Sequence, residues 1–138
     1  MLSDKASFST ICPGMSIVQT IDDSEDCSIY VAEPNDSDSS LDQTSCESPS
    51  KVVLKIGRTK KHSAALLNEY NLLSKLDHPY IAKAEGLHKS KVRGAVKLTL
   101  PYLGNGDLAR LIEEEDIDEN LAKYLSHQML TGLMYLHS

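Results

Sequence analysis

Residues 51–79 read KVVLKIGRTKKHSAALLNEYNLLSKLDHP, and the expected architecture is built outward from this stretch. Residues 51–56 are a short, mostly aliphatic and β-branched run that ends at Gly57, which is the pattern of a strand. Between Ser63 and Leu76, leucine and alanine recur at spacings of three and four, which predicts a helix with one apolar face. Pro79 ends that helix, because the residue before a proline is pushed out of helical geometry.

Further elements are predicted on both sides of this stretch. Asp107 can accept hydrogen bonds from the free amides of a helix that begins at Leu108. Asp118 opens a longer helix whose leucines and methionine recur on one face. Short apolar runs bounded by turn residues predict four more strands, at residues 15–21, 27–33, 80–87 and 94–100.

Composition limits the class of protein. Apolar residues make up 41% of the chain and charged residues 25%, which are ordinary globular values. No apolar run approaches the roughly 18 residues that a membrane span needs. Cys12, Cys27 and Cys46 are scattered, which argues against a disulfide framework or a zinc site. We therefore expect an intracellular, cytoplasmic protein that contacts neither membrane nor nucleic acid.

Charge is divided unevenly along the chain. Residues 1–50 carry ten acidic side chains and one lysine, a net charge of −9, whereas residues 51–138 carry +3. Residues 34–50 include six serines and four acids. They have too few apolar side chains to offset the entropy lost when a segment becomes ordered. They are expected to form a disordered insertion, either phosphorylated or simply tolerated at the surface. Residues 1–14 show no sustained period and are expected to be a loose N-terminus.

Two patterns within the opening stretch resemble the protein kinase catalytic domain. The run from Val52 to Lys55 resembles the strand motif V-A-I-K, whose lysine reaches the α- and β-phosphates of ATP. Glu69 stands where the helix of that family carries the glutamate that pairs with this lysine. Either residue alone would more often be a solvent-facing charge. His78 is expected to be a structural turn or capping residue.

Residues 98–108, LTLPYLGNGDL, resemble the hinge between the two lobes of a kinase. The resemblance makes Leu100 the gatekeeper behind the adenine pocket. It also implies that the Pro101 carbonyl and the Leu103 amide bond the adenine edge. Asp107 would meet the ribose or a basic substrate residue, or would only cap the following helix. Val53 stands in place of the alanine that covers the adenine, which narrows the pocket.

Residues 121–138 resemble the long helix that precedes the kinase catalytic loop. The run Gln128, Gly132 and Tyr135 to His137 matches most specifically. The four patterns occur in the order of the family. They imply an α+β fold: a kinase small lobe at 15–100 with a five-stranded antiparallel sheet and one helix. A hinge at 101–106 and the first two helices of the large lobe at 107–138 would follow.

The resemblance implies a function and also two departures from it. Members of the family use ATP with Mg²⁺ to phosphorylate a hydroxyl of a protein substrate, here Ser or Thr, with Tyr left open. Asp22, Ser24 and Cys27 stand where three glycines should cover the phosphates, and the acids at 22–26 should weaken ATP binding. No H-R-D or D-F-G run occurs, so the sequence offers no catalytic residue and no metal ligand. This polypeptide alone is expected to be inactive.

Three interpretations follow from these patterns. The first is an N-terminal part of an active protein kinase that stops before the catalytic loop. The second is a pseudokinase-like binding or scaffold module with weak or no nucleotide binding, which the missing glycines favour. The third is a small interaction domain with an acidic tail, whose likeness to kinases is accidental.

Overall fold

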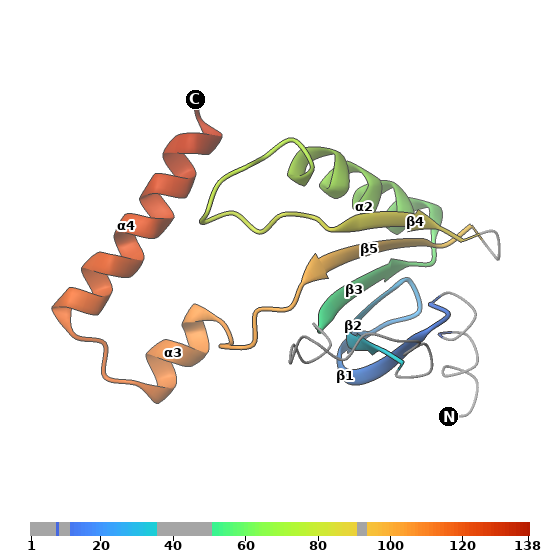
Figure 1. The fold of residues 1–138 in the computed structure, drawn as a ribbon, viewed down its shortest axis with the longest axis horizontal. Helices are drawn as coiled ribbons and strands as arrows, with labels where there is room; N and C mark the ends of the chain where they lie inside the picture. The colour runs from blue at the N-terminus through green and yellow to red at the C-terminus, as the bar shows by residue number, and fades with distance from the viewer. Residues whose placement is uncertain (1–7, 9–11, 36–50, 91–93) are drawn as a thin grey trace, which may run out of the picture.

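The computed structural model describes residues 8, 12–35, 51–90 and 94–138, and its centre is a twisted antiparallel sheet (Figure 1). Five strands pair in the order β1-β2-β3-β5-β4. They are β1 (Met15–Asp23), β2 (Cys27–Pro34), β3 (Val52–Gly57), β4 (Gly86–Lys89) and β5 (Val96–Pro101). The five-stranded antiparallel sheet expected from the sequence is confirmed.

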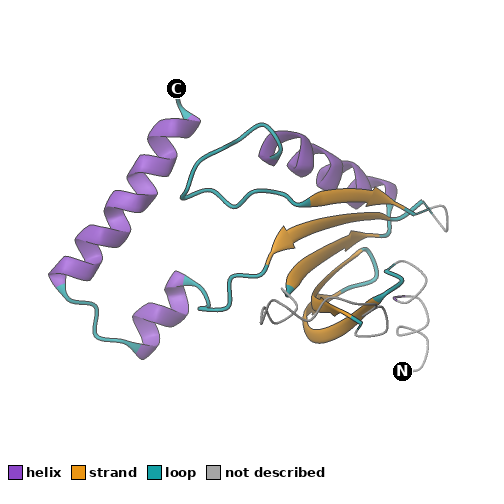
Figure 2. Ribbon diagram, viewed as in Figure 1, coloured by secondary structure: helices purple, strands orange, loops and turns teal. Residues whose placement is uncertain are grey.

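The helices with described bounds are α2 (Lys60–Leu73), α3 (Leu108–Glu114) and α4 (Glu119–Leu136). Helix α2 lies along the sheet, whereas α3 and α4 follow β5 and lie to one side of it (Figure 2). This arrangement confirms the α+β class and a sheet followed by two further helices. Within the described ranges, no helix is both long enough and apolar enough to cross a membrane.

Helix α2 is shifted from its expected place at 63–76. It begins three residues earlier because Thr59 caps it, with the Thr59 side chain accepting from the His62 amide. It also ends earlier, at Leu73, well before Pro79. Leu66 is the buried residue of this helix, and Leu72, which the spacing placed on the apolar face, is 57% exposed.

The strand expected at 80–87 is largely wrong. Only Gly86 and Leu87 of that range lie in a strand, and β4 then continues to Lys89. The Glu85 amide still donates to the Thr99 carbonyl at 2.9 Å. Two residues further along β5 stands Pro101, which has no amide hydrogen to extend the ladder. Residues 80–84 therefore leave the sheet and run toward α4.

The outer face of the sheet, opposite α2, carries a core of its own. Phe8 and Cys12 are buried there against Tyr30 and Leu54, and the rings of Phe8 and Tyr30 meet edge to face at 5.3 Å. The expectation of a loose N-terminus at 1–14 is therefore wrong for these two residues, and β2 is covered on both faces instead of being half-buried. Residues 36–50, most of the expected acidic insertion, lie outside the described residues.

Helix α4 touches the rest of the chain through the loop that follows α2. The Asp77 amide donates to the Tyr135 hydroxyl at 3.0 Å, and the ring of His78 stacks on that of Tyr135 at 5.0 Å. Gly132 is buried beside Tyr80, where its lack of a side chain permits close packing. His78 also accepts from the Tyr80 amide at 3.2 Å, in keeping with its expected role as a turn residue.

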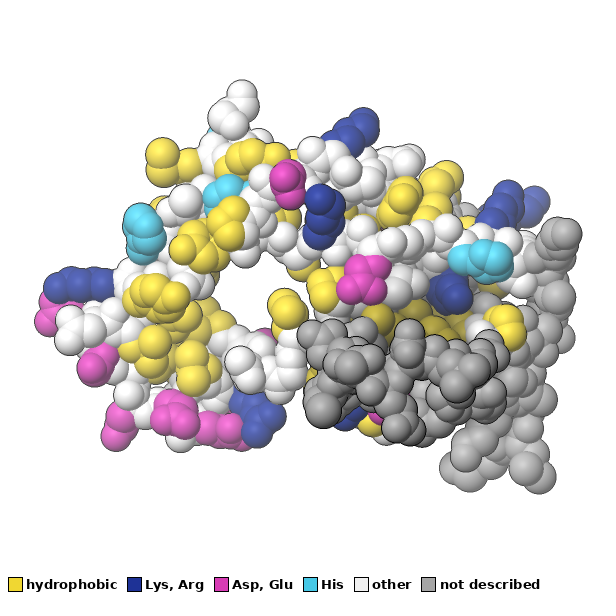
Figure 3. Space-filling view, viewed as in Figure 1, with side chains coloured by type: hydrophobic (Ala, Val, Ile, Leu, Met, Phe, Trp, Pro, Cys, Tyr) yellow, Lys and Arg dark blue, Asp and Glu magenta, His cyan; other side chains and the backbone are white. Residues whose placement is uncertain are grey.

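Much of the apolar surface of α3 and α4 is uncovered in this structure. Figure 3 shows hydrophobic side chains gathered over these two helices. Apolar surface left in water forgoes about 25 cal/mol per Å² relative to burial. The exposed large apolar residues on the two helices are Leu108, Ile112, Tyr124, Met129, Leu130, Leu133, Met134 and Leu136.

Candidate nucleotide-binding site

Lys55 and Glu69 meet between the sheet and α2. The Nζ atom of Lys55 lies 2.7 Å from Oε1 of Glu69, and the two side chains are 28% and 32% exposed. The partial burial makes this charge-assisted hydrogen bond stronger than a fully exposed pair. The pair holds the ammonium of Lys55 at one position on the α2 face of β3.

Gly57 sets the distance between β3 and α2. A Cβ atom at this position would lie 2.9 Å from the backbone of His62 and 2.9 Å from that of Ser63. The Ser63 hydroxyl donates to the Gly57 carbonyl at 3.0 Å, which fastens the first turn of α2 to the end of β3. Because Glu69 is carried by α2, this close approach also positions the acid that holds Lys55.

The hinge lines a cavity of about 460 Å³ beside the sheet. Val53, Pro101, Leu103 and Asp107 all line it, so the structure brings together four of the residues that the resemblance selected. Lys55 does not line this cavity but stands two positions beyond Val53 on β3, roughly 7 Å further along the strand.

Leu100 and Asp107, on either side of the hinge, make contacts within the fold. Leu100 does not line the cavity; it packs instead against the cluster of Leu66, Val96 and Leu98 under α2. The Oδ1 atom of Asp107 accepts from the Arg110 amide at 2.8 Å and caps α3. The capping interpretation of Asp107 is therefore confirmed, and a contact with ribose stays a prediction.

Sequence reasoning missed part of the cavity wall. Gln19 and Ile21 of β1, Tyr102 of the hinge and Arg110 of α3 also line it. The signal available for Ile21 was its place at the end of an apolar run, directly before the acidic turn. Nothing in the local pattern indicated Gln19, because β-bulges interrupt the alternation of β1.

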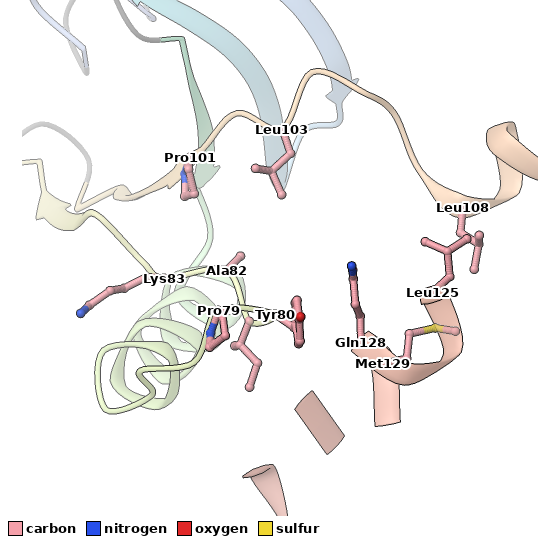
Figure 4. Close-up of a pocket in the computed structure, with 11 residues that line it drawn as sticks. Pro79, Tyr80, Ala82, Lys83, Pro101, Leu103, Leu108, Leu125, Gln128 and Met129 are labelled. Atoms are coloured by element: carbon pink, nitrogen blue, oxygen red, sulfur yellow. The ribbon is translucent and has the colours of Figure 1, made fainter. Parts of the chain in front are cut away.

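A second cavity of about 520 Å³ lies on the other side of the hinge (Figure 4). Gln128 and Met129 reach into it from α4, facing Tyr80 across the opening. Pro101 and Leu103 line both cavities, so the hinge is the wall between them. No sequence pattern had indicated this second cavity, because its walls come from separate segments of the chain: residues 79–83, the hinge and α4.

A β-bulge decides which acids face Lys55. Thr20 pairs with Tyr30 while Asp22 pairs with Ile29, so Ile21 is an extra residue on β1. Ile29 in turn pairs with Lys55 on β3. Residues directly opposite on neighbouring strands share one face of a sheet. Asp22 therefore lies in line with Lys55, about 10 Å away across two strand spacings.

Asp23 is turned to the outer face, where it is held by several groups. Its Oδ1 atom accepts from the Ser28 hydroxyl at 2.6 Å and from the Tyr30 hydroxyl at 2.9 Å. The Arg58 guanidinium lies 3.5 Å away and donates also to the Ser24 carbonyl at 3.0 Å. These contacts, with the Ser28 hydrogen bond the strongest, hold the pKa of Asp23 below its usual value.

Replacing Asp23 by asparagine is expected to change how stability depends on pH. Because the folded-state pKa of Asp23 lies below its unfolded value of about 3.9, its charge stabilises the fold fully above that value. This contribution is lost as the pH falls through the lower folded-state pKa. Asp23→Asn should therefore be less stable than the wild type at pH 7, and the gap should narrow on acidification.

Urea denaturation at pH 7, pH 5 and pH 3 measures this effect. Glu25→Gln, at an exposed position of the same turn, is the matched control and should track the wild type throughout. A gap between Asp23→Asn and the wild type that stays constant with pH would show that the Asp23 charge has no part in stability.

Comparisons with known proteins identify the family of this chain. The family model described as a protein kinase domain matches residues 40–138. This chain belongs to the protein kinase family. The kinase domain is 32% identical over 110 residues to human mitogen-activated protein kinase 4, a match that covers 72% of this chain. The interpretation as an unrelated interaction domain is therefore wrong.

Further kinases match shorter parts of the chain. Mitogen-activated protein kinase 4 of rat is 34% identical over 96 residues, 64% of this chain. Mitogen-activated protein kinase kinase 7 of Arabidopsis thaliana is 32% identical over 73 residues, 53% of this chain. The kinase domain described here spans 18% of the human relative, 34% of the rat one and 23% of the plant one.

Within the ranges that the structure describes, no three His, Cys, Asp or Glu side chains cluster closely enough to hold a metal ion. Members of the kinase family generally use ATP together with Mg²⁺.

Proposed function

We propose that this chain is the nucleotide-holding part of a protein kinase that binds ATP and acts on Ser or Thr hydroxyls of a protein substrate. The observation that carries the proposal is the 2.7 Å contact between Lys55 and Glu69 beside the hinge cavity. An ammonium on an interior-facing strand position needs an anionic partner, and the pair presents its charge where phosphates would lie.

The geometry supports a defined placement of the nucleotide. The adenine would enter the hinge cavity between Ile21 and Val53 on one side and Leu103 on the other. Its edge would bond the Pro101 carbonyl and the Leu103 amide, and the α- and β-phosphates would lie at Lys55. Along β3, Val53 precedes Lys55, so the base and the phosphates follow the order in which the strand presents these groups.

A second candidate function is a scaffold with little nucleotide binding. The acidic turn after β1 favours it, because Asp22 lies in line with Lys55 and carries the same charge as a phosphate. In either case the 138 residues by themselves are expected to transfer no phosphate, since their sequence includes no H-R-D or D-F-G run.

Replacing Lys55 by methionine tests the binding proposal. ATP should raise the melting temperature of the full chain, and Lys55→Met should weaken ATP binding about tenfold or more, a loss of about 1.4 kcal/mol or more. Differential scanning fluorimetry across a series of ATP concentrations measures the shift, and titration calorimetry gives the dissociation constant.

Lys97→Met is the matched control. Lys97 lies on β5 opposite Ile56, on the outer face of the sheet and away from the Lys55–Glu69 pair. This variant should keep the ATP-dependent shift of the wild type. Equal shifts in the wild type and Lys55→Met would contradict the proposed role of Lys55, and no shift in any variant would favour the scaffold.

A further inference from the structure

The turn between β1 and β2 uses its own backbone donors. The Ser24 amide donates to the Cys27 carbonyl at 3.0 Å, and the Cys27 amide donates to the Ser24 hydroxyl oxygen at 3.2 Å. The same hydroxyl donates to the Cys27 carbonyl at 2.6 Å. These amides stand at two of the glycine positions of the family pattern, and both already have acceptors. A phosphate could be bound there only by breaking these bonds.

The turn is also fastened to the start of the loop after β3. The Arg58 amide donates to the Asp26 carbonyl at 2.9 Å, and the Arg58 guanidinium donates to the Ser24 carbonyl at 3.0 Å. The same guanidinium pairs with Asp23 on the outer face. The contacts of Arg58 with Ser24 and Asp26 of the turn and with Asp23 at the end of β1 hold the turn in one conformation. Arg58 itself is thereby engaged away from the nucleotide side.

The charge around the turn is unfavourable for a further phosphate. Asp22 faces the same side as Lys55, and Glu25 and Asp26 are exposed on the turn. The pKa of the Cys27 thiol reflects this field: burial raises it most, the Asp22 carboxylate raises it further, and Lys55 lowers it. Glu69 pairs with the ammonium of Lys55, and the negative charge of Asp22 further reduces the attraction between Lys55 and a phosphate.

The order of groups along β3 shows which phosphate would meet the turn. Val52 pairs with Pro101 at the hinge end, and Gly57 pairs with Cys27 at the turn end. Lys55 lies between them. A nucleotide whose adenine lies in the hinge cavity would thus pass Lys55 before its last phosphate approached the turn.

We propose that this site binds adenine nucleotides through the adenine and the first two phosphates and makes no favourable contact with the γ-phosphate, so that ADP binds as tightly as ATP. The inference rests on the proposed nucleotide binding at Lys55 and the hinge. The specificity-determining residues are Asp22, Ser24 and Cys27. The backbone amides of Ser24 and Cys27 already have acceptors, and Asp22 adds a carboxylate. The interactions that would favour a third phosphate are therefore missing.

Titration calorimetry of the full chain with adenosine, ADP and ATP, in buffer with excess Mg²⁺, tests this inference. The dissociation constants of ADP and ATP should agree within about threefold, while adenosine should bind at least about fivefold more weakly because it cannot reach Lys55. ATP binding more than about threefold tighter than ADP would overturn the inference and leave the proposed function intact. No binding of any of the three ligands would overturn both.

Two variants show whether the turn is responsible. Asp22→Asn removes one charge at an exposed position, and the triple variant Asp22→Gly, Ser24→Gly, Cys27→Gly also frees the turn. Each should raise the preference for ATP over ADP, the triple variant by about fivefold or more. Asp116→Asn, an exposed acid in the loop between α3 and α4, should keep the wild-type ratio. An unchanged ratio in Asp22→Asn and in the triple variant would overturn the role of the turn.

Discussion

Replacing Leu54 by alanine is expected to lower the free energy of unfolding by about 3 kcal/mol, within the usual range for a buried leucine. Leu54 lies in the middle of β3 and is 0% exposed. It packs on the outer face among Phe8, Cys12 and Tyr30. These neighbours are fixed in the sheet and in the chain before β1, so they cannot move in to fill the space left by the Leu54 side chain. The free energy of the resulting cavity therefore adds to the lost apolar transfer free energy.

Equilibrium denaturation in urea measures this change. Leu72→Ala is the matched control, since Leu72 lies on α2 with 57% of its surface exposed and should change stability by about 0.5 kcal/mol or less. If Leu54→Ala were no more destabilised than Leu72→Ala, the outer face of the sheet would not be a packed core. The described position of Phe8 and Cys12 would then be wrong.

Replacing Gly57 by alanine is expected to cost about 2 kcal/mol and to loosen the candidate site as well. The added methyl group would lie 2.9 Å from the backbone of both His62 and Ser63. Backbone atoms in the first turn of a helix cannot rotate aside, so α2 as a whole must move away from β3. Glu69 moves with α2, and we expect the contact with Lys55 to lengthen.

Two measurements separate these effects. Urea denaturation gives the stability, and ATP titration of Gly57→Ala gives the affinity, which should fall together with it. Gly86→Ala is the control, because nothing lies within 4 Å of a Cβ atom at Gly86 and its φ angle is not positive. That variant should match or slightly exceed the wild-type stability. Unchanged stability of Gly57→Ala would mean that α2 does not approach β3 this closely.

Much of the fold could be predicted because its elements carry strong local patterns. The aliphatic, β-branched run around Lys55 and the leucine spacing near Leu66 each indicate one element, and both elements are present. The errors lie where a distant partner decides. Residues 80–84 have strand-like composition, but the ladder between β4 and β5 stops at Thr99, and Pro101, where β5 ends, has no amide hydrogen to extend it. The sequence of residues 80–84 alone does not show whether a neighbouring strand can pair with them.

The candidate site divides in the same way. The residues at the hinge could be selected because a local stretch of the chain resembles the kinase hinge, and Val53, Pro101, Leu103 and Asp107 line one cavity. Gln19 could not be selected in this way, because a bulge shifts the residues of β1 relative to β2. The capping role of Asp107, in contrast, depends only on the three residues that follow it. The sequence therefore already indicated it as one of the possible roles of Asp107.

The sequence by itself determined most of the elements and their order, because each depends on the period or the composition of a short segment. Its resemblance to the kinase motifs selected the hinge and the pairing candidates Lys55 and Glu69. The tertiary structure alone decided the sides on which the acids of the β1–β2 turn lie. One extra residue at Ile21 places Asp22 in line with Lys55 and turns Asp23 toward Arg58. A bulge arises from pairing between strands, so the period of one strand cannot reveal it.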